Sequence, residues 1–188
     1  YKFENANSNS PSREDITGSN FPTGYISCVE LGASENQLLV TFSNYGVTSI
    51  FESTDGGTTW ASKDSDDEIL PDMPVRWALY NPEDRNEVLL ATEIGIWYTS
   101  DFGASAPQWE PSIDGLANVR VDMLKIRQSD NLVIAATHGR GLFSSTMFQG
   151  GTCTATEVAN SDHSATGSVT GTTGTVVSVT CDAGYGGG

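Results

Sequence analysis

One octapeptide, Ser-Thr-Asp-Gly-Gly-Thr-Thr-Trp from Ser53 to Trp60, constrains the local fold of this chain more than any other feature. Gly56 and Gly57 can adopt positive φ angles without steric cost, as a tight β-hairpin turn requires. Asp55 can accept hydrogen bonds from turn amides that no strand partner reaches. Trp60 starts the return strand and can cover the hairpin with a large apolar face. The segment therefore predicts a stapled turn between two antiparallel strands, a structural role rather than a chemical one.

The strand that leads into this turn recurs twice, at positions 50, 96 and 142, a spacing of about 46 residues. The copies Ile50 to Asp55, Ile96 to Asp101 and Leu142 to Met147 all run from aliphatic through aromatic to hydroxyl-bearing residues. Two further sets of apolar strands repeat upstream: Leu38 to Phe42, Val88 to Thr92 and Val133 to Thr137, and Tyr25 to Leu31, Val75 to Tyr80 and Val119 to Leu124. This period with four short strands is that of a β-propeller blade.

The repeat predicts an all-β chain: a partial β-propeller of about three four-stranded antiparallel blades, followed by a small cysteine-containing β module. The blades would span Tyr25 to about Asp64, Val75 to Ile113 and Val119 to Thr146, the last without a clear outer strand. Because propellers hold four to eight blades, residues 1–149 are expected to be a fragment of a larger propeller. The alternating segment Tyr1 to Asn7 fits the outer strand of an earlier blade.

The octapeptide matches the pattern S-x-D-x-G-x-T-W, known as the Asp-box or bacterial neuraminidase repeat. The stretches Leu70 to Trp77 and Ala135 to Phe143 are similar to blade linkers of sortilin-like and xyloglucanase-like propellers. The chain thus resembles the Asp-box propellers of the sialidase, sortilin and xyloglucanase kind, as in secreted proteins of marine Bacteroidetes. The resemblance implies structural Asp-box roles for Ser53, Asp55, Gly57, Thr59 and Trp60, and for Asp101, Gly103 and Trp109 in a degenerate second copy.

Residues 150–188 have a different composition, rich in Thr, Ser and Gly and without an aromatic side chain before Tyr185. The segment from Cys181 to Tyr185 resembles the C-x-x-G-Y turn of sushi modules, which implies an incomplete module of this kind. Cys153 and Cys181 are the disulfide candidates, and a disulfide indicates an oxidising compartment. The alternative is a Thr- and Gly-rich tail with two free thiols. Cys28, within an apolar strand, is expected to be an inert buried thiol.

The charge of the chain restricts its partners. A formal net charge of −15 with only nine Lys and Arg residues argues against nucleic acid, whose phosphates need clustered basic side chains. No apolar run approaches the ~20 residues needed to span a bilayer. We expect a secreted or cell-surface protein. Its partners would be a glycan or protein ligand, and the remaining blades of the same protein or of a neighbouring subunit.

Ligand-binding candidates lie on one rim. If the strands of each blade are named A to D from the axis outward, B-to-C turns and D-to-A linkers share the rim opposite the Asp-boxes. The candidates there are Arg76, Arg120, Glu93, His138 and Arg140. Arg76 and Arg120 each follow a valine at matching positions, with Ile26 in the third copy, and paired guanidinium groups can grip a carboxylate. A second interpretation is that these arginines pair with Asp72 and Asp114 and hold neighbouring blades together.

Other sites are less defined. Asp64, Asp66, Asp67 and Glu68 form an acidic loop whose oxygens can bind Ca²⁺, or a solvated acidic turn, because no D-x-D-x-D-G pattern is present. No other metal or cofactor is expected. No nucleophile elbow, P-loop or zinc motif occurs, so no catalytic residue is assigned.

Two functions remain. The first is an extracellular propeller module that binds glycan or protein without catalysis. The alternative is part of a glycoside hydrolase propeller, sialidase- or xyloglucanase-like. An enzyme would need two inward-facing carboxylates ~5–9 Å apart.

Overall fold

The computed structural model of this chain describes residues 1–64, 70–112, 115–116, 118–148, 157–170 and 177–183. It falls into two compact units, Tyr1–Phe148 and Gln149–Gly188. Every named strand lies in the first unit, and no helix occurs among the described residues. None of them therefore belongs to a helix long and apolar enough to cross a membrane. The expected all-β class is confirmed.

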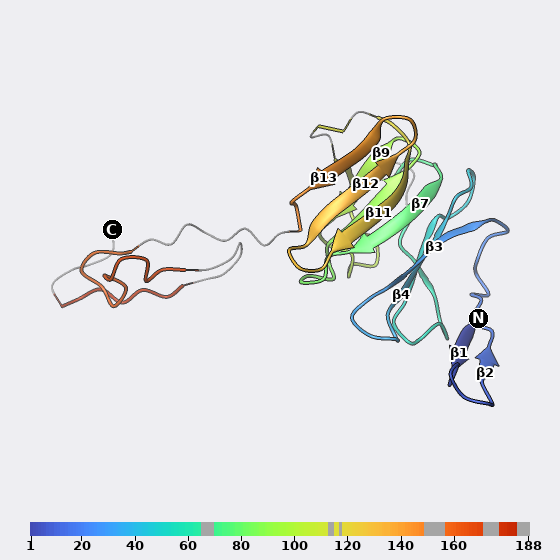
Figure 1. Ribbon diagram of the computed structural model, residues 1–188, viewed down its shortest axis with the longest axis horizontal. Helices are drawn as coiled ribbons and strands as arrows, with labels where there is room; N and C mark the ends of the chain where they lie inside the picture. Colours follow the sequence, from blue (N-terminus) through green and yellow to red (C-terminus); the bar gives the residue numbers. More distant parts are fainter. Residues whose placement is uncertain (65–69, 113–114, 117, 149–156, 171–176, 184–188) are drawn as a thin grey trace. The chain divides into compact units, whose positions relative to one another are not determined.

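Three antiparallel sheets form the body of the first unit (Figure 1). Blade one contains β3 (Ile26–Leu31), β4 (Leu38–Phe42), β5 (Ile50–Ser53) and β6 (Ala61–Ser62), in that order. Blade two contains β7 (Val75–Tyr80), β8 (Val88–Thr92), β9 (Gly95–Thr99) and β10 (Glu110–Pro111). Among the described residues, blade three contains β11 (Val121–Arg127), β12 (Leu132–Thr137) and β13 (Gly141–Ser145). The first strand of blade two, β7, contacts both β3 and β11, so the chain forms a partial β-propeller with its first strands gathered together.

Apolar side chains fill the spaces between neighbouring sheets. Between blades one and two the core includes Leu39, Ile50, Tyr80, Leu90 and Phe102. Between blades two and three it includes Leu79, Leu89, Val121, Leu124 and Phe148. Full burial of one such aliphatic or aromatic side chain stabilises a fold by about 1.5–3 kcal/mol, so these two interfaces hold the blades together.

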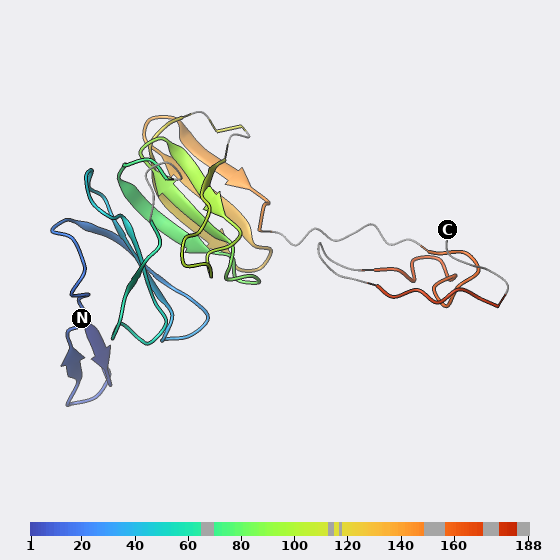
Figure 2. The same ribbon diagram turned by 180° about the vertical axis from the view of Figure 1, so that it is seen from behind.

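A short hairpin precedes the blades (Figure 2). It pairs β1 (Lys2–Glu4) with β2 (Ser12–Glu14). The strand expected from Tyr1 to Asn7 is therefore shorter, because Asn5 turns the backbone with a φ of 52°. The segment after β2 docks on blade one, where Trp60 Nε1 donates to the Ile16 carbonyl at 3.0 Å.

The first strand of each blade carries a β-bulge near its start, between Ile26 and Cys28, Val75 and Trp77, and Val121 and Met123. The bulged residues are therefore Ser27, Arg76 and Asp122. Arg76 matches Asp122 in register rather than Arg120, which corrects the expected alignment of the two arginines. Ser27 takes the third position in place of Ile26.

Two valines explain this error. Val119 and Val121 both fit the start of an inner strand in the sequence. In the structure Val121 is fully buried and pairs with Thr137, while the Arg120 carbonyl, one residue earlier, accepts the His138 amide at 2.8 Å. Burial of Val121 therefore sets the register of β11.

The second unit is described over residues 157–170 and 177–183. Ser161 and Cys181 form an isolated antiparallel bridge, and Asp162 Oδ1 accepts the Thr180 amide at 2.8 Å. Cys181 is exposed, whereas Cys153 lies outside the described residues. The sushi-like module and the Cys153–Cys181 disulfide therefore stay predictions.

Candidate functional site

The turns of the first unit gather on two opposite rims. On one, which we call the stapled rim, the turn after the first strand meets the turn after the third strand in blades one and two. There the Gly56 amide donates to the Asn36 carbonyl at 2.9 Å, and the Phe102 amide to the Asn86 carbonyl at 2.9 Å. The other, which we call the linker rim, combines the turns after β4, β8 and β12 with the segments before β3, β7 and β11. There the Gly46 amide donates to Asp72 Oδ1 at 2.7 Å.

The turn after β5 is closed by side-chain hydrogen bonds. Asp55 Oδ1 accepts the Thr59 amide and the Ser53 hydroxyl, both at 2.8 Å, and Oδ2 accepts the Thr59 hydroxyl at 2.6 Å. Ser53 Oγ in turn accepts the Gly57 amide at 2.8 Å. These bonds, first that from the Thr59 hydroxyl, lower the pKa of Asp55 to about 2. Because the carboxylate oxygens are engaged within the turn, Asp55 holds backbone together and is poorly placed to bind a ligand.

The turn after β9 is also closed by an aspartate that accepts a hydroxyl and a backbone amide, although this turn contains an insertion. Asp101 Oδ1 accepts the Thr99 hydroxyl at 2.6 Å and the Gln108 amide at 2.9 Å. The Gly103 amide donates to Asn86 Oδ1 at 3.2 Å. Trp109 then enters the core, 4% exposed. Membership of both turns in the Asp-box repeat remains an interpretation of their sequence.

On the linker rim of blade two, Arg76 and Glu93 form an ion pair. Arg76 Nε and Nη2 lie 3.0 and 2.5 Å from Glu93 Oε2, and both side chains are partly exposed. Asp72 instead caps the Gly46 amide. The suggested Arg76–Asp72 pair is therefore wrong, because the bulge places Arg76 beside the turn after β8.

On the linker rim of blade three, Asp122 lies between Arg120 and His138. Arg120 Nε is 2.5 Å from Asp122 Oδ1, and His138 Nδ1 is 3.3 Å from Oδ2. Burial pushes the pKa of Asp122 upward, but the hydrogen bonds from Arg120 and His138 outweigh it, and the pKa lies below its ordinary value. Arg140 is exposed in the same turn, and Asp114, the suggested partner of Arg120, lies outside the described residues.

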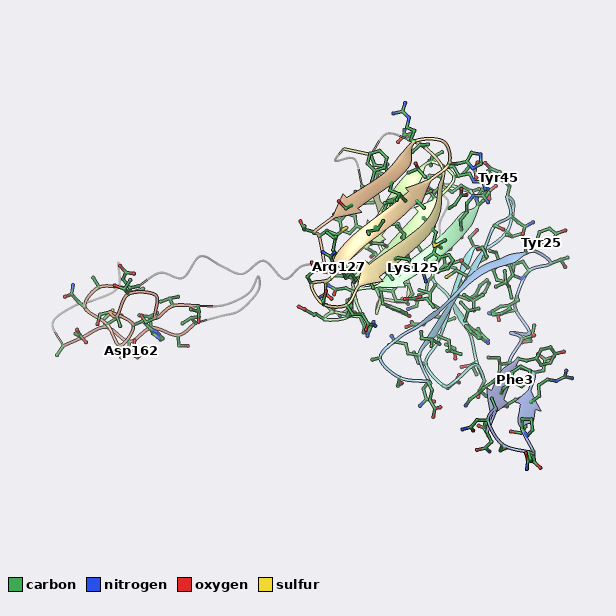
Figure 3. The ribbon with its side chains drawn as sticks, in the orientation of Figure 1. Phe3, Tyr25, Tyr45, Lys125, Arg127 and Asp162 are labelled. Atoms are coloured by element: carbon green, nitrogen blue, oxygen red, sulfur yellow. The ribbon has the colours of Figure 1, made fainter. Side chains whose placement is uncertain are left out.

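Two exposed tyrosines complete the linker rim on blade one (Figure 3). Tyr25 is 77% exposed and Tyr45 is 63% exposed. The segments that carry them are joined, because the Tyr25 amide donates to Asn44 Oδ1 at 2.6 Å and the Ser43 amide donates to the Tyr25 carbonyl at 3.0 Å. Sequence reasoning treated Tyr25 only as a strand residue and missed Tyr45, although an aromatic side chain within the Asn-Tyr-Gly turn was an available signal.

The described residues contain no group of three or more His, Cys, Asp or Glu side chains that could hold a metal ion. Asp64 Oδ2 accepts the Ser49 amide at 2.8 Å. The other members of the proposed Ca²⁺ loop, Asp66, Asp67 and Glu68, lie outside the described residues. A Ca²⁺ site there stays a prediction.

Comparison with known proteins finds no matching family model and no matching curated protein. Among solved structures, the GH74 xyloglucanase from Xanthomonas campestris is similar with 14% identity and a TM-score of 0.49, over 66% of this chain and 20% of that one. The Niastella koreensis GH74 enzyme is similar with 21% identity and a TM-score of 0.40, over 74% and 23%. The chain thus spans between a fifth and a quarter of these proteins.

Proposed function

We propose that this chain is an extracellular propeller module that binds a glycan, or a protein that presents one, through its linker rim and without catalysis. The observation that carries this proposal is the exposed pair Tyr25 and Tyr45 on one rim. Tyrosine offers a flat apolar face with a polar tip at low conformational cost, which suits stacking on the apolar face of a sugar ring.

The neighbouring ion pairs add polar recognition. Arg76 donates to Glu93 through Nε and one terminal nitrogen, and a guanidinium group carries five N–H donors. Donors therefore remain for hydroxyl or carboxylate groups of a ligand. Arg120 and His138, held by Asp122, supply a second set on blade three.

The alternative is that the chain is part of a glycoside hydrolase. A glycosidase needs a general acid whose pKa is raised, beside a second carboxylate that stays ionised. On the described linker rim, Glu93 and Asp122 are both paired with arginine, and the pKa of Asp122 is lowered. This pattern favours binding over catalysis.

One experiment separates the two functions. The full chain is incubated with a panel of soluble polysaccharides; retention is followed by affinity electrophoresis, and hydrolysis by the release of reducing ends. We expect retardation by at least one polysaccharide without release of reducing ends. Release that rises with protein concentration would favour the hydrolase, and absence of retardation across a panel of neutral and acidic glycans would contradict glycan binding.

A further inference from the structure

An open groove lies between blades two and three, beside β13. It has a volume of about 610 Å³, and its apolar lining includes Leu89, Ile96, Val133, Ala135, Phe143 and Met147. In the first two blades a fourth strand pairs with the third. Within the part of the chain that the structure describes, no strand pairs with the outer edge of β13. The groove therefore combines an apolar hollow with a strand edge that no described strand covers.

The corresponding space between blades one and two is filled. Matching hydrogen bonds identify the equivalent residues of the two blades. The Lys63 amide donates to the Ile50 carbonyl at 3.0 Å, and the Ser112 amide donates to the Ile96 carbonyl at 2.8 Å. Lys63 and Ser112 are thus equivalent. The side chain of Lys63 is buried against blade two, whereas the short side chain of Ser112 leaves its space open to the groove.

A tryptophan completes the filled interface. Trp109, immediately before β10, is 4% exposed and donates from Nε1 to the Lys63 carbonyl at 2.9 Å. The same contact occurs one blade earlier, where Trp60 precedes β6 and donates to the Ile16 carbonyl at 3.0 Å. In both places an indole ring packs against apolar side chains, and its Nε1–H donates to a backbone carbonyl of the chain segment that precedes its own sheet, in blade one, or of the preceding blade, in blade two.

Blade three lacks this tryptophan. Phe148 is buried, as Phe102 is at the equivalent place in blade two. Residues 149–188, however, contain no tryptophan, and Tyr185 is their only aromatic residue. Residues 149–188 therefore cannot repeat the indole contact that occurs twice before them.

We propose that this groove binds an extended peptide strand, supplied by another polypeptide, that carries a tryptophan. The strand adds antiparallel to the outer edge of β13, as β10 adds to β9. Its indole ring enters the groove and donates to the Ser112 carbonyl. Glu110 at the groove and the net charge of −15 favour a neutral or basic strand over an acidic one.

The chain's own outer strand provides a probe. A fluorescein-labelled peptide with the sequence of residues 57–63, Gly-Thr-Thr-Trp-Ala-Ser-Lys, is titrated with the full chain and followed by fluorescence anisotropy. We expect saturable binding. Alanine in place of the tryptophan should weaken binding at least about tenfold, because a buried aromatic anchor is lost. A 1-methyltryptophan peptide, which keeps the ring but lacks the N–H, should bind about fivefold more weakly.

Two protein variants locate the site. Ser145→Trp fills the groove and should abolish peptide binding. Leu142→Ala alters the same strand at a residue that does not line the groove, so peptide binding should be unchanged. If Ser145→Trp fails to fold, the three peptides on the natural chain still decide the question. Equal binding of the tryptophan and alanine peptides, or no binding up to the solubility limit of the peptide, would overturn the proposal.

Discussion

Lys63 and Glu52 form a buried ion pair, with Nζ 3.1 Å from Oε2 and both side chains less than a tenth exposed. Lys63 Nζ also donates to the carbonyls of Phe102 and Ala104, at 2.9 and 2.8 Å. Glu52 accepts from Gln37 as well. The ammonium group thus connects the outer edge of blade one to the stapled turn of blade two.

Breaking this pair should destabilise the first unit strongly. Lys63→Met leaves Glu52 buried without its charge partner, so the free energy of unfolding should fall by about 3–5 kcal/mol. The double variant Lys63→Met/Glu52→Leu removes both charges and should recover much of that loss. Urea denaturation measures both effects. A single variant as stable as the natural chain would show that Lys63 does not join the blades.

Two buried tryptophans of blade two differ in the hydrogen bonding of their indole N–H groups. Trp109 Nε1 donates to the Lys63 carbonyl, whereas Trp97 Nε1 is buried and has no hydrogen-bond partner among the described residues. Trp109→Phe should therefore cost about 1–2 kcal/mol more in unfolding free energy than Trp97→Phe. Chemical denaturation of the two variants checks this, and equal losses would show that the indole hydrogen bond contributes nothing.

Asp55 should make stability depend on pH below neutrality. Its pKa falls from 3.8 to about 2 on folding, so it stabilises the folded state above pH 4, and this contribution is lost as the pH falls toward 2. Asp55→Ala should lower the Tm at pH 7 and reduce the slope of Tm against pH between pH 4 and 2. Ligand retention should not change, because Asp55 lies on the stapled rim. Loss of retention at an unchanged Tm would contradict this role.

The cysteines should differ in reactivity. Cys28 is buried, and burial raises the pKa of its thiol to about 11, so it should not react with a thiol reagent in the folded protein. If Cys153 and Cys181 are bonded, only one thiol should react after denaturation without reductant. Detection of three thiols under those conditions would contradict the disulfide and remove this support for an oxidising compartment.

The sequence predicted best those strands whose residues are all buried and whose apolar pattern recurs from blade to blade. Leu38–Phe42 and Val88–Thr92 are strands β4 and β8 with the expected bounds, because all their side chains are buried between packed sheets. The turn after β5 is likewise local, since its bonding groups lie within a few residues of one another. In both cases short-range pattern and structure coincide.

The sequence could not predict the linker rim in detail. A bulge shifts the register by one residue, so Arg76 aligned with Arg120 in the sequence but with Asp122 in the structure. Arg76 pairs with Glu93 because the turn after β8 folds back beside the bulge of β7, and Arg120 pairs with Asp122 at the bulge of β11. The exposure of Tyr45 and the burial of Lys63 likewise depend on neighbouring sheets, which no local pattern reports.

Retention of the chain on a glycan array, with and without the two rim tyrosines, tests the central claim most directly. Tyr25→Ala/Tyr45→Ala should abolish retention at an unchanged Tm, because both side chains are largely exposed and contribute little to the core. The matched control is Tyr1→Ala, an exposed tyrosine on the N-terminal hairpin, which should retain full binding. Undiminished retention of the double variant, or equal loss in the control, would contradict ligand binding at the linker rim.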